Sequence, residues 1–299
     1  MTTLLRVLMI GNSFSICVGK DLPPLVASIP GYDIALTSAY IGGCSLETHW
    51  ANVQESEAEP EARQYDATTW MVTPTRDIAV SRRKASLNEL IQKGDWDIIT
   101  IQQASHFSWK PETYQPYADN LVAYIREHAP SAAVWIQQTW AYRADDGRLR
   151  GEGDWAIDQA EMHKRLTAAY ADLAARFDAP VIPTGRAVQL TRERDPRPFA
   201  VPTPEELALL RPPDLPSQAG DVVGRYNGWT QDHATRELIL SMDTIHLNRR
   251  GEYLQACVWF LALFGLDDIP ESAYIPSDIG RQDALFLRSC ARDAVKLGP

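Results

Sequence analysis

Short apolar runs alternate with amphipathic stretches over the first two thirds of the chain. A short apolar run that ends at glycine or polar residues is typical of a buried strand, and apolar positions three or four residues apart indicate a helix. The expected strands are residues 4–10, 33–41, 96–102, 132–138 and 180–182. The expected helices between them are residues 21–29, 87–93, 114–128 and 154–177, the last with Asp154 as its cap. This alternation predicts βαβ units and a mostly parallel sheet in an α/β fold.

Two stretches lack such a pattern, and two helices close the chain. Residues 49–83 are irregular and polar, which favours an excursion near a site, and residues 191–224 are rich in proline and charge. A short helix is expected at 204–210, and the closing helices at 248–264 and 277–296. We therefore expect one domain over residues 1–299. Its loop insertions are expected near 49–85, 140–153 and 186–240, with a C-terminal helical segment at 267–299.

Composition and charge narrow the function classes. The 299 residues include 29 Lys and Arg against 39 Asp and Glu, so the net charge is −10. An acidic chain without a basic run is a poor binder of nucleic acid or anionic membranes. The apolar run at 4–10 is too short for a transmembrane span and no signal-peptide cleavage site follows it, which favours a cytoplasmic protein. A chain from which a signal peptide had been removed would look the same.

The cysteines suggest neither a metal site nor a redox motif. Cys17, Cys44, Cys257 and Cys290 lie far apart and form no Cys-x-x-Cys pair. A chain of this size needs no disulfide, so free thiols are favoured over paired ones. We therefore expect no metal and no cofactor.

Polar residues follow three of the expected strands. Ser13 comes just after the first strand, Gly42 and Gly43 after the second, and Gln102 and Gln103 after the third. Ligands of open parallel sheets bind at the carboxyl ends of the strands, so these residues are expected near one another. Each alone has an ordinary explanation, because serine caps helices and glycine forms turns.

A late segment adds a candidate base. Asp243 precedes His246 by three residues and can fold back to orient its imidazole. The ordinary alternative is a turn at Asp243 and a helix cap at Asn248. Taken together, the serine, glycines, amides and Asp-x-x-His supply a nucleophile, an oxyanion hole, a general base and its orienting carboxylate.

These residues resemble the sequence blocks of the SGNH (GDSL-type) hydrolase superfamily, in a little-characterised bacterial branch. Gly11-Asn12-Ser13-Phe14 is similar to block one, with Asn12 where many members carry aspartate, and Gly43 is similar to the block-two glycine. Asp243 and His246 match block five. The third block departs, because a glutamine, which we assign to Gln103, stands in place of asparagine. The resemblance implies a flavodoxin-like three-layer α/β/α sandwich with a five-stranded parallel sheet, and metal-free hydrolysis of acyl esters.

The expected mechanism assigns each residue a role. Ser13 attacks the ester carbonyl, His246 moves the proton, and Asp243 orients the imidazole. The N–H groups of Ser13 and Gly43 and the Gln103 amide bind the oxyanion, with Gln102 as the next candidate donor. Cys44 is a rival nucleophile, but buried and inert cysteine is the commoner state.

The substrate is less well specified by the sequence. Several tryptophans lie in expected loops and could stack on a sugar, although packing on the core is the commoner role. The expected substrate is a short acyl ester, acetyl above all, on a carbohydrate or other small molecule. Residues expected to line the pocket are Asn12, His49, His106 and Trp140. The alternatives are a lipid or thioester hydrolase and a non-catalytic carbohydrate-binding protein. The oligomeric state stays open.

Overall fold

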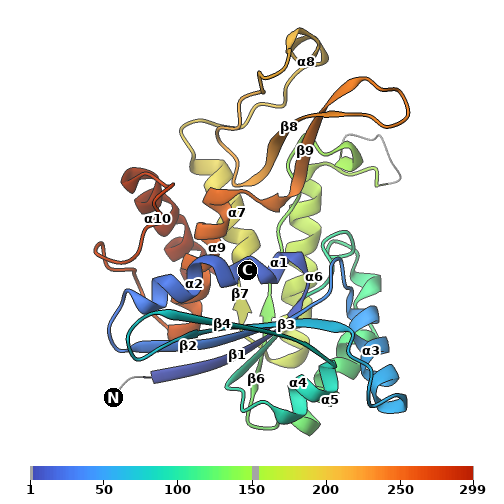
Figure 1. The fold of residues 1–299 in the computed structure, drawn as a ribbon, viewed down its shortest axis with the longest axis vertical. Helices are drawn as coiled ribbons and strands as arrows, with labels where there is room; N and C mark the ends of the chain where they lie inside the picture. The colour runs from blue at the N-terminus through green and yellow to red at the C-terminus, as the bar shows by residue number, and fades with distance from the viewer. Residues whose placement is uncertain (1–2, 150–154, 299) are drawn as a thin grey trace.

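A seven-stranded sheet forms the centre of the computed structural model, which describes residues 3–149 and 155–298 (Figure 1). Its strand order is β4-β3-β2-β1-β5-β6-β7. The strands are β1 Thr3–Gly11, β2 Tyr32–Tyr40, β3 Tyr65–Val72, β4 Ile78–Ala85, β5 Ile98–Ile101, β6 Ala133–Gln137 and β7 Val181–Ile182. The neighbouring strands β2, β1, β5, β6 and β7 pair in parallel. β3 pairs antiparallel with both β2 and β4. The α/β class with a mainly parallel sheet is confirmed, and the count of five strands is exceeded by a hairpin.

The helices form two layers on opposite sides of the sheet (Figure 1). One group packs together on one side and consists of α2 Val18–Ala27, α7 Thr184–Arg194, α9 Arg249–Phe264 and α10 Arg281–Leu297. The other consists of α3 Leu46–Ala58, α4 Leu87–Lys93 and α5 Tyr117–His128, with α6 Gln159–Phe177 beside β6. The chain winds from β1 towards β2 and later from β1 towards β7. Right-handed crossovers in opposite directions place their helices on opposite faces.

Residues 49–83, expected to be irregular, instead hold most of α3 and the β3–β4 hairpin. β4 is an edge strand that is exposed along most of its length and carries Arg82, Arg83 and Lys84. Charged residues on an edge strand prevent pairing with other chains. They also remove the apolar run by which a strand is recognised in a sequence, which is why this hairpin was not predicted.

The segment expected as a proline-rich insertion also contains regular structure. Residues 191–224 hold the end of α7, the short helix α8 Pro204–Leu209 and the start of β8 Val223–Gln231, which pairs with β9 Leu238–Leu247 in an antiparallel ribbon. The ribbon and α8 project from the body of the molecule (Figure 1). A two-stranded ribbon with both faces largely in solvent has no continuous apolar face, so its sequence gives little strand signal.

Side-chain caps set several helix starts. Asn248 caps α9, the ordinary role left open for it by the sequence, because its side chain accepts from the N–H groups of Arg250 and Gly251. Asp158 caps α6, so this helix begins after the expected start, and the expected cap Asp154 lies outside the described residues. Within the described ranges, no helix is both long and apolar enough to cross a bilayer.

Candidate active site

Ser13 opens the short helix α1 Ser13–Ile16 directly after β1, the strand between β2 and β5 in the sheet. Asn12 caps this helix, since its Oδ1 accepts from the N–H of Phe14 at 3.0 Å. The turn requires glycine at position 11, because a Cβ there would lie 2.4 Å from Ser15 Oγ. The tight turn leaves Ser13 partly exposed while its neighbours Asn12 and Phe14 are buried.

His246 meets Ser13 from the other end of the chain. Its Nε2 lies 2.9 Å from Ser13 Oγ, and its Nδ1 lies 2.9 Å from Asp243 Oδ2. Both contacts were expected from the sequence, and the geometry confirms them as contacts. The three side chains therefore form a continuous hydrogen-bonded series from carboxylate to imidazole to hydroxyl.

An irregularity in β9 allows Asp243 and His246 to meet. Asp243 pairs with Arg225, and Leu247 pairs with Val223. Between these two pairs β9 advances by four residues while β8 advances by two, so β9 contains a bulge. The extra residues turn the backbone back on itself, and Asp243 Oδ1 accepts from the N–H groups of Ile245 and His246, both at 3.0 Å. Bulges of this kind re-aim side chains next to active sites.

Asp243 is held in its ionised form. Burial raises the pKa of this carboxyl group, but hydrogen bonds from the His246 ring and from two backbone N–H groups outweigh burial and bring the pKa well below its usual value. An ionised carboxylate accepts from Nδ1–H and thereby selects the tautomer whose Nε2 lone pair faces Ser13. The arrangement can remove a proton from the serine hydroxyl.

Comparison with known families matches residues 6–197 to the model "Domain of unknown function (DUF4886)". The chain belongs to the DUF4886 family. The matched segment includes Ser13 and ends before Asp243 and His246. None of the curated proteins matches the chain.

Two solved structures place this DUF4886 protein among known folds. A DUF4886 family protein from Bacteroides uniformis is 25% identical, with a TM-score of 0.73, and the match covers 98% of this chain and 95% of that one. A proposed SGNH hydrolase from Slackia heliotrinireducens is 17% identical, with a TM-score of 0.51, covering 87% and 100%. The second likeness shows that the fold is that of SGNH hydrolases, as the sequence blocks suggested.

The hydrogen bonds of Gln103 do not support its expected oxyanion role in this DUF4886 protein. Gln103 is fully buried, its Oε1 accepts from the N–H groups of Leu46 and Ala104, and its Nε2 donates to Thr113. Both ends of the amide are thus already bound within the chain, where they join the segments around Leu46, Ala104 and Thr113. Gln102 is also buried, and its Nε2 donates to Asn12 Oδ1 at 2.8 Å.

Two backbone N–H groups remain as candidate oxyanion donors. Within the described residues, the N–H groups of Ser13 and Gly43 donate to no other group of the chain. Gly43 has a φ of +63°, a conformation that glycine adopts without strain. Backbone N–H groups that are left without partners, in a turn or at the start of a helix, are suited to binding developing negative charge.

Three of the four expected substrate contacts are buried and serve other purposes. Asn12 joins the turn after β1 to the loop after β2, because its Nδ2 donates to the Cys44 carbonyl at 2.9 Å. Trp140 is fully buried and stacks on Phe14. His49 is fully buried, with its Nδ1 2.9 Å from the Tyr65 hydroxyl. Sequence alone cannot separate such residues from pocket residues, because both are polar or aromatic residues at strand ends.

His106 keeps its place as a candidate substrate contact. It is partly exposed and packs on Phe107, with ring centroids 4.1 Å apart. Burial, together with the neighbouring cations Arg148 and Lys110, lowers its pKa. A neutral imidazole at this position can both donate and accept a hydrogen bond.

Cys44 is not arranged as a nucleophile. It is buried, and burial raises the pKa of its thiol to about 12. The reactive form of cysteine is the thiolate, which this environment disfavours. Within residues 3–149 and 155–298, no group of three or more histidine, cysteine or carboxylate side chains is arranged to hold a metal ion.

Proposed function

We propose that this DUF4886 protein is a serine ester hydrolase. The observation that carries the proposal is the pair of 2.9 Å contacts that joins Asp243, His246 and Ser13. The SGNH hydrolase fold supports it, and so does the resemblance of Gly11-Asn12-Ser13-Phe14 and of Asp243 and His246 to sequence blocks of that superfamily.

Ser13 Oγ attacks the ester carbonyl carbon while His246 Nε2 takes the hydroxyl proton. The carbonyl oxygen gains negative charge, which the N–H groups of Ser13 and Gly43 stabilise. When the carbon–oxygen bond to the alcohol breaks, His246 returns the proton to the leaving oxygen. Water then attacks the acyl-serine, with His246 again acting as base, and releases the acid and free Ser13.

The preferred substrate is a short acyl ester, acetyl above all, on a carbohydrate or other small polar alcohol. The triad lies at an open surface, since 38% of the His246 side chain and 17% of the Asp243 side chain are exposed. An open, hydrated site suits a polar alcohol better than a long apolar chain, which needs an enclosed channel. Trp140 is buried and cannot stack on a sugar. The proposal therefore rests on the exposure of His246 and Asp243 and on the acidic net charge of the chain.

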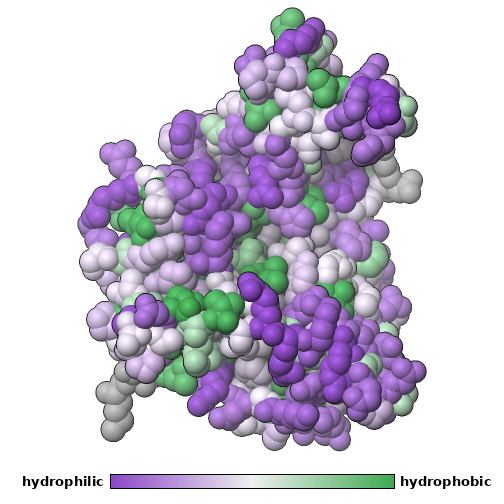
Figure 2. All heavy atoms as spheres, in the orientation of Figure 1, coloured by the Kyte–Doolittle hydropathy of each residue, from purple (hydrophilic) through white to green (hydrophobic). Residues whose placement is uncertain are grey.

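A second candidate, hydrolysis of apolar acyl esters or thioesters, is favoured by the projecting arm formed by α8, β8 and β9. Five of the nine large apolar side chains that are exposed in the described structure lie between residues 209 and 242. They are Leu209, Leu215, Leu238, Ile239 and Met242. Figure 2 shows hydrophobic side chains among polar ones at the tip of this arm. Met242 directly precedes Asp243 in the sequence, so the strand that carries some of these side chains leads into the triad.

A series of p-nitrophenyl esters from acetyl to decanoyl separates the two candidates. The short-acyl proposal expects the highest kcat/KM with acetyl and a steep fall as the chain lengthens. A maximum at about eight carbons or longer would replace it with the apolar candidate. Ser13→Ala is the blank, and a wild-type rate no higher than this blank for every ester would refute hydrolysis. Binding of sugars without turnover would then favour a carbohydrate-binding protein.

A further inference from the structure

Trp140 connects the two segments that carry the triad. It follows β6, is fully buried, and its ring stacks on Phe14 with centroids 4.0 Å apart and planes 14° apart. Its Nε1–H donates to the carbonyl of Ile245 at 2.9 Å. Phe14 directly follows Ser13, and Ile245 directly precedes His246. One side chain therefore contacts the neighbours of both the nucleophile and the base.

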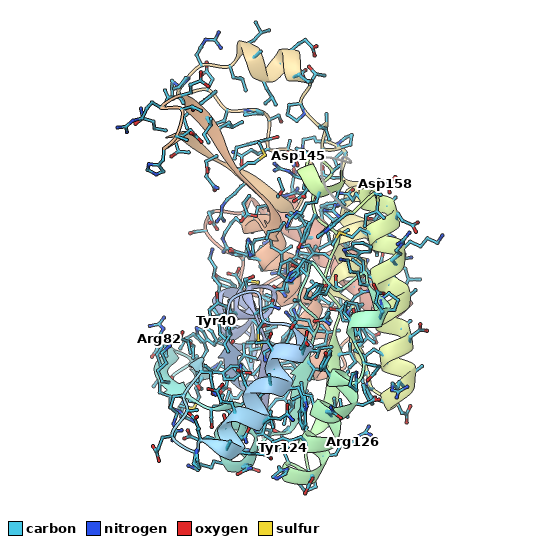
Figure 3. All side chains as sticks on the ribbon, turned by 90° about the vertical axis from the view of Figure 1, so that its right-hand side faces the viewer. Tyr40, Arg82, Tyr124, Arg126, Asp145 and Asp158 are labelled. Carbon is cyan, nitrogen blue, oxygen red and sulfur yellow. The ribbon has the colours of Figure 1, made fainter. Side chains whose placement is uncertain are left out.

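The loop that contains Trp140 also binds Thr244, which lies in the turn between Asp243 and His246. The Thr244 carbonyl accepts from the N–H of Arg143 at 2.8 Å, and Thr244 Oγ1 donates to Asp146 Oδ2 at 2.6 Å. Asp146 is buried and is itself bound by Arg148. Asp145, which precedes Asp146 in the sequence, is labelled in Figure 3 and shows that this loop lies at the base of the β8–β9 ribbon.

The turn needs such support because β9 belongs to a projecting two-stranded ribbon. A ribbon of this kind is only marginally stable without packing against other elements. The base must nevertheless stay within hydrogen-bond distance of Ser13, and a displacement of about 1 Å can cost roughly 100-fold in rate.

We propose that Trp140 is a positioning residue that sets the distance between Ser13 and His246. Asp146, in the same loop, supports the same turn by binding Thr244. The inference rests on the proposed function, because it assigns Trp140 a role in activating Ser13 through His246. It differs from the role expected from the sequence, in which Trp140 touches the substrate.

The test measures how fast Ser13 reacts with a fluorophosphonate, which requires a base-activated serine but no knowledge of the natural ester. Trp140→Phe keeps a ring to stack on Phe14 and removes the N–H that binds Ile245. We expect its labelling rate and its kcat for p-nitrophenyl acetate to fall in parallel by about tenfold or more, with KM changed less than about twofold. Thr244→Val, which removes the hydroxyl that binds Asp146, is expected to lower both rates in the same way.

Trp259→Phe is the matched control. Trp259 is also fully buried, and within the described structure its indole N–H has no hydrogen-bond partner. The same chemical change there should leave labelling and kcat within about twofold of wild type. Circular dichroism and melting temperature establish that each variant is folded.

A double variant separates positioning from a general loss of structure. If Trp140 acts through His246, Trp140→Phe should cause no further loss in a His246→Ala background. An equal loss in that background, or unchanged labelling in folded Trp140→Phe and Thr244→Val, would overturn the inference and leave the hydrolase proposal standing. Ser13 labelling without ester turnover would refute the hydrolase proposal while the labelling rates still decide the role of Trp140. If wild type labels no faster than Ser13→Ala, both fail.

Discussion

His246 Nε2 lies 2.9 Å from Ser13 Oγ although 233 positions separate the two residues in the sequence. The start of α1 is held on two sides, because the Phe14 carbonyl accepts from Gln137 Nε2 at 2.8 Å and from Gln255 Nε2 at 2.9 Å. Gln137 ends β6, and Gln255 lies in α9, which follows His246. The sheet and the helix that follows His246 thus both bind the backbone beside Ser13, which holds Ser13 and His246 in place relative to each other.

Asp243→Asn is expected to lower kcat by roughly 10⁴-fold while the protein stays folded. The amide can donate to the imidazole and so favours the tautomer that cannot accept the Ser13 proton. Steady-state kinetics with p-nitrophenyl acetate measure the effect. Asp232→Asn makes the same chemical change at the exposed turn of the ribbon, where Asp232 accepts from the N–H groups of Ala234 and Thr235, and should keep near wild-type kcat. Similar losses in both variants would contradict the role of Asp243.

The acid side of the pH–rate profile is expected to follow one ionisation. A base must be unprotonated to accept the Ser13 proton, so one protonation is expected to stop the reaction on the acid side. Asp243 contributes no second step, because burial raises its pKa but the hydrogen bonds from His246 and Ile245 lower it further, to well below the usual range. A plot of log(kcat/KM) against pH should therefore have an acid limb of slope about one. A slope of about two would show that another group must also be ionised.

The parts of the fold that were predictable are those with a buried apolar pattern. β1, β5 and β6 are buried by helices on both faces, so their sequences read as apolar runs. β4 and the β8–β9 ribbon were not predictable, because each of these strands is paired on one side only and carries exposed residues, such as Arg82 and Arg83 of β4. Apolar periodicity reports burial, and an exposed strand lacks it.

The contacts among Ser13, His246 and Asp243 were predictable, whereas the residues that support them were not. Ser13 and His246 stand in short motifs whose spacing follows from local turns. Gln103 and Trp140 lie at strand ends where polar and aromatic side chains either face the substrate or satisfy buried groups. The role of each side chain depends on its hydrogen-bond partner, which is Thr113 for Gln103 and Ile245 for Trp140. No sequence motif identifies these partners. This is why Gln103 was assigned to the oxyanion hole and Trp140 to the substrate.

Gln103→Leu is expected to reduce stability far more than turnover. The change leaves the buried N–H groups of Leu46 and Ala104 without an acceptor, at a cost of about 1–3 kcal/mol each. Urea unfolding should therefore show a loss of a few kcal/mol. In the folded variant kcat should fall by less than about tenfold, whereas loss of an oxyanion donor costs roughly 100- to 1000-fold. If kcat of the folded variant, measured without urea, fell by roughly 100-fold or more, Gln103 would again be assigned to the oxyanion hole.

His49 is expected to make the folded protein sensitive to mild acid. Burial lowers the pKa of His49 to about 3, and its ring contacts the Tyr65 hydroxyl and the Cys44 thiol. The same side chain in the unfolded chain has an ordinary pKa of about 6.5, so the unfolded state binds the proton first as pH falls. The stabilising contribution is therefore complete above pH about 6.5 and is lost progressively as the pH falls towards 3.

Between pH 6 and pH 4 this single group should remove about 2 kcal/mol from the free energy of unfolding. Urea titrations at pH 6, 5 and 4 on wild type and His49→Gln measure it, and the comparison uses the slope with pH because the substitution also changes packing. The variant should lose about 2 kcal/mol less than wild type over this interval. His233→Gln, at the exposed turn of the ribbon, should follow the wild-type slope. Parallel slopes for wild type and His49→Gln would show that His49 is protonated equally in the folded and unfolded states, and would contradict its burial as a neutral base.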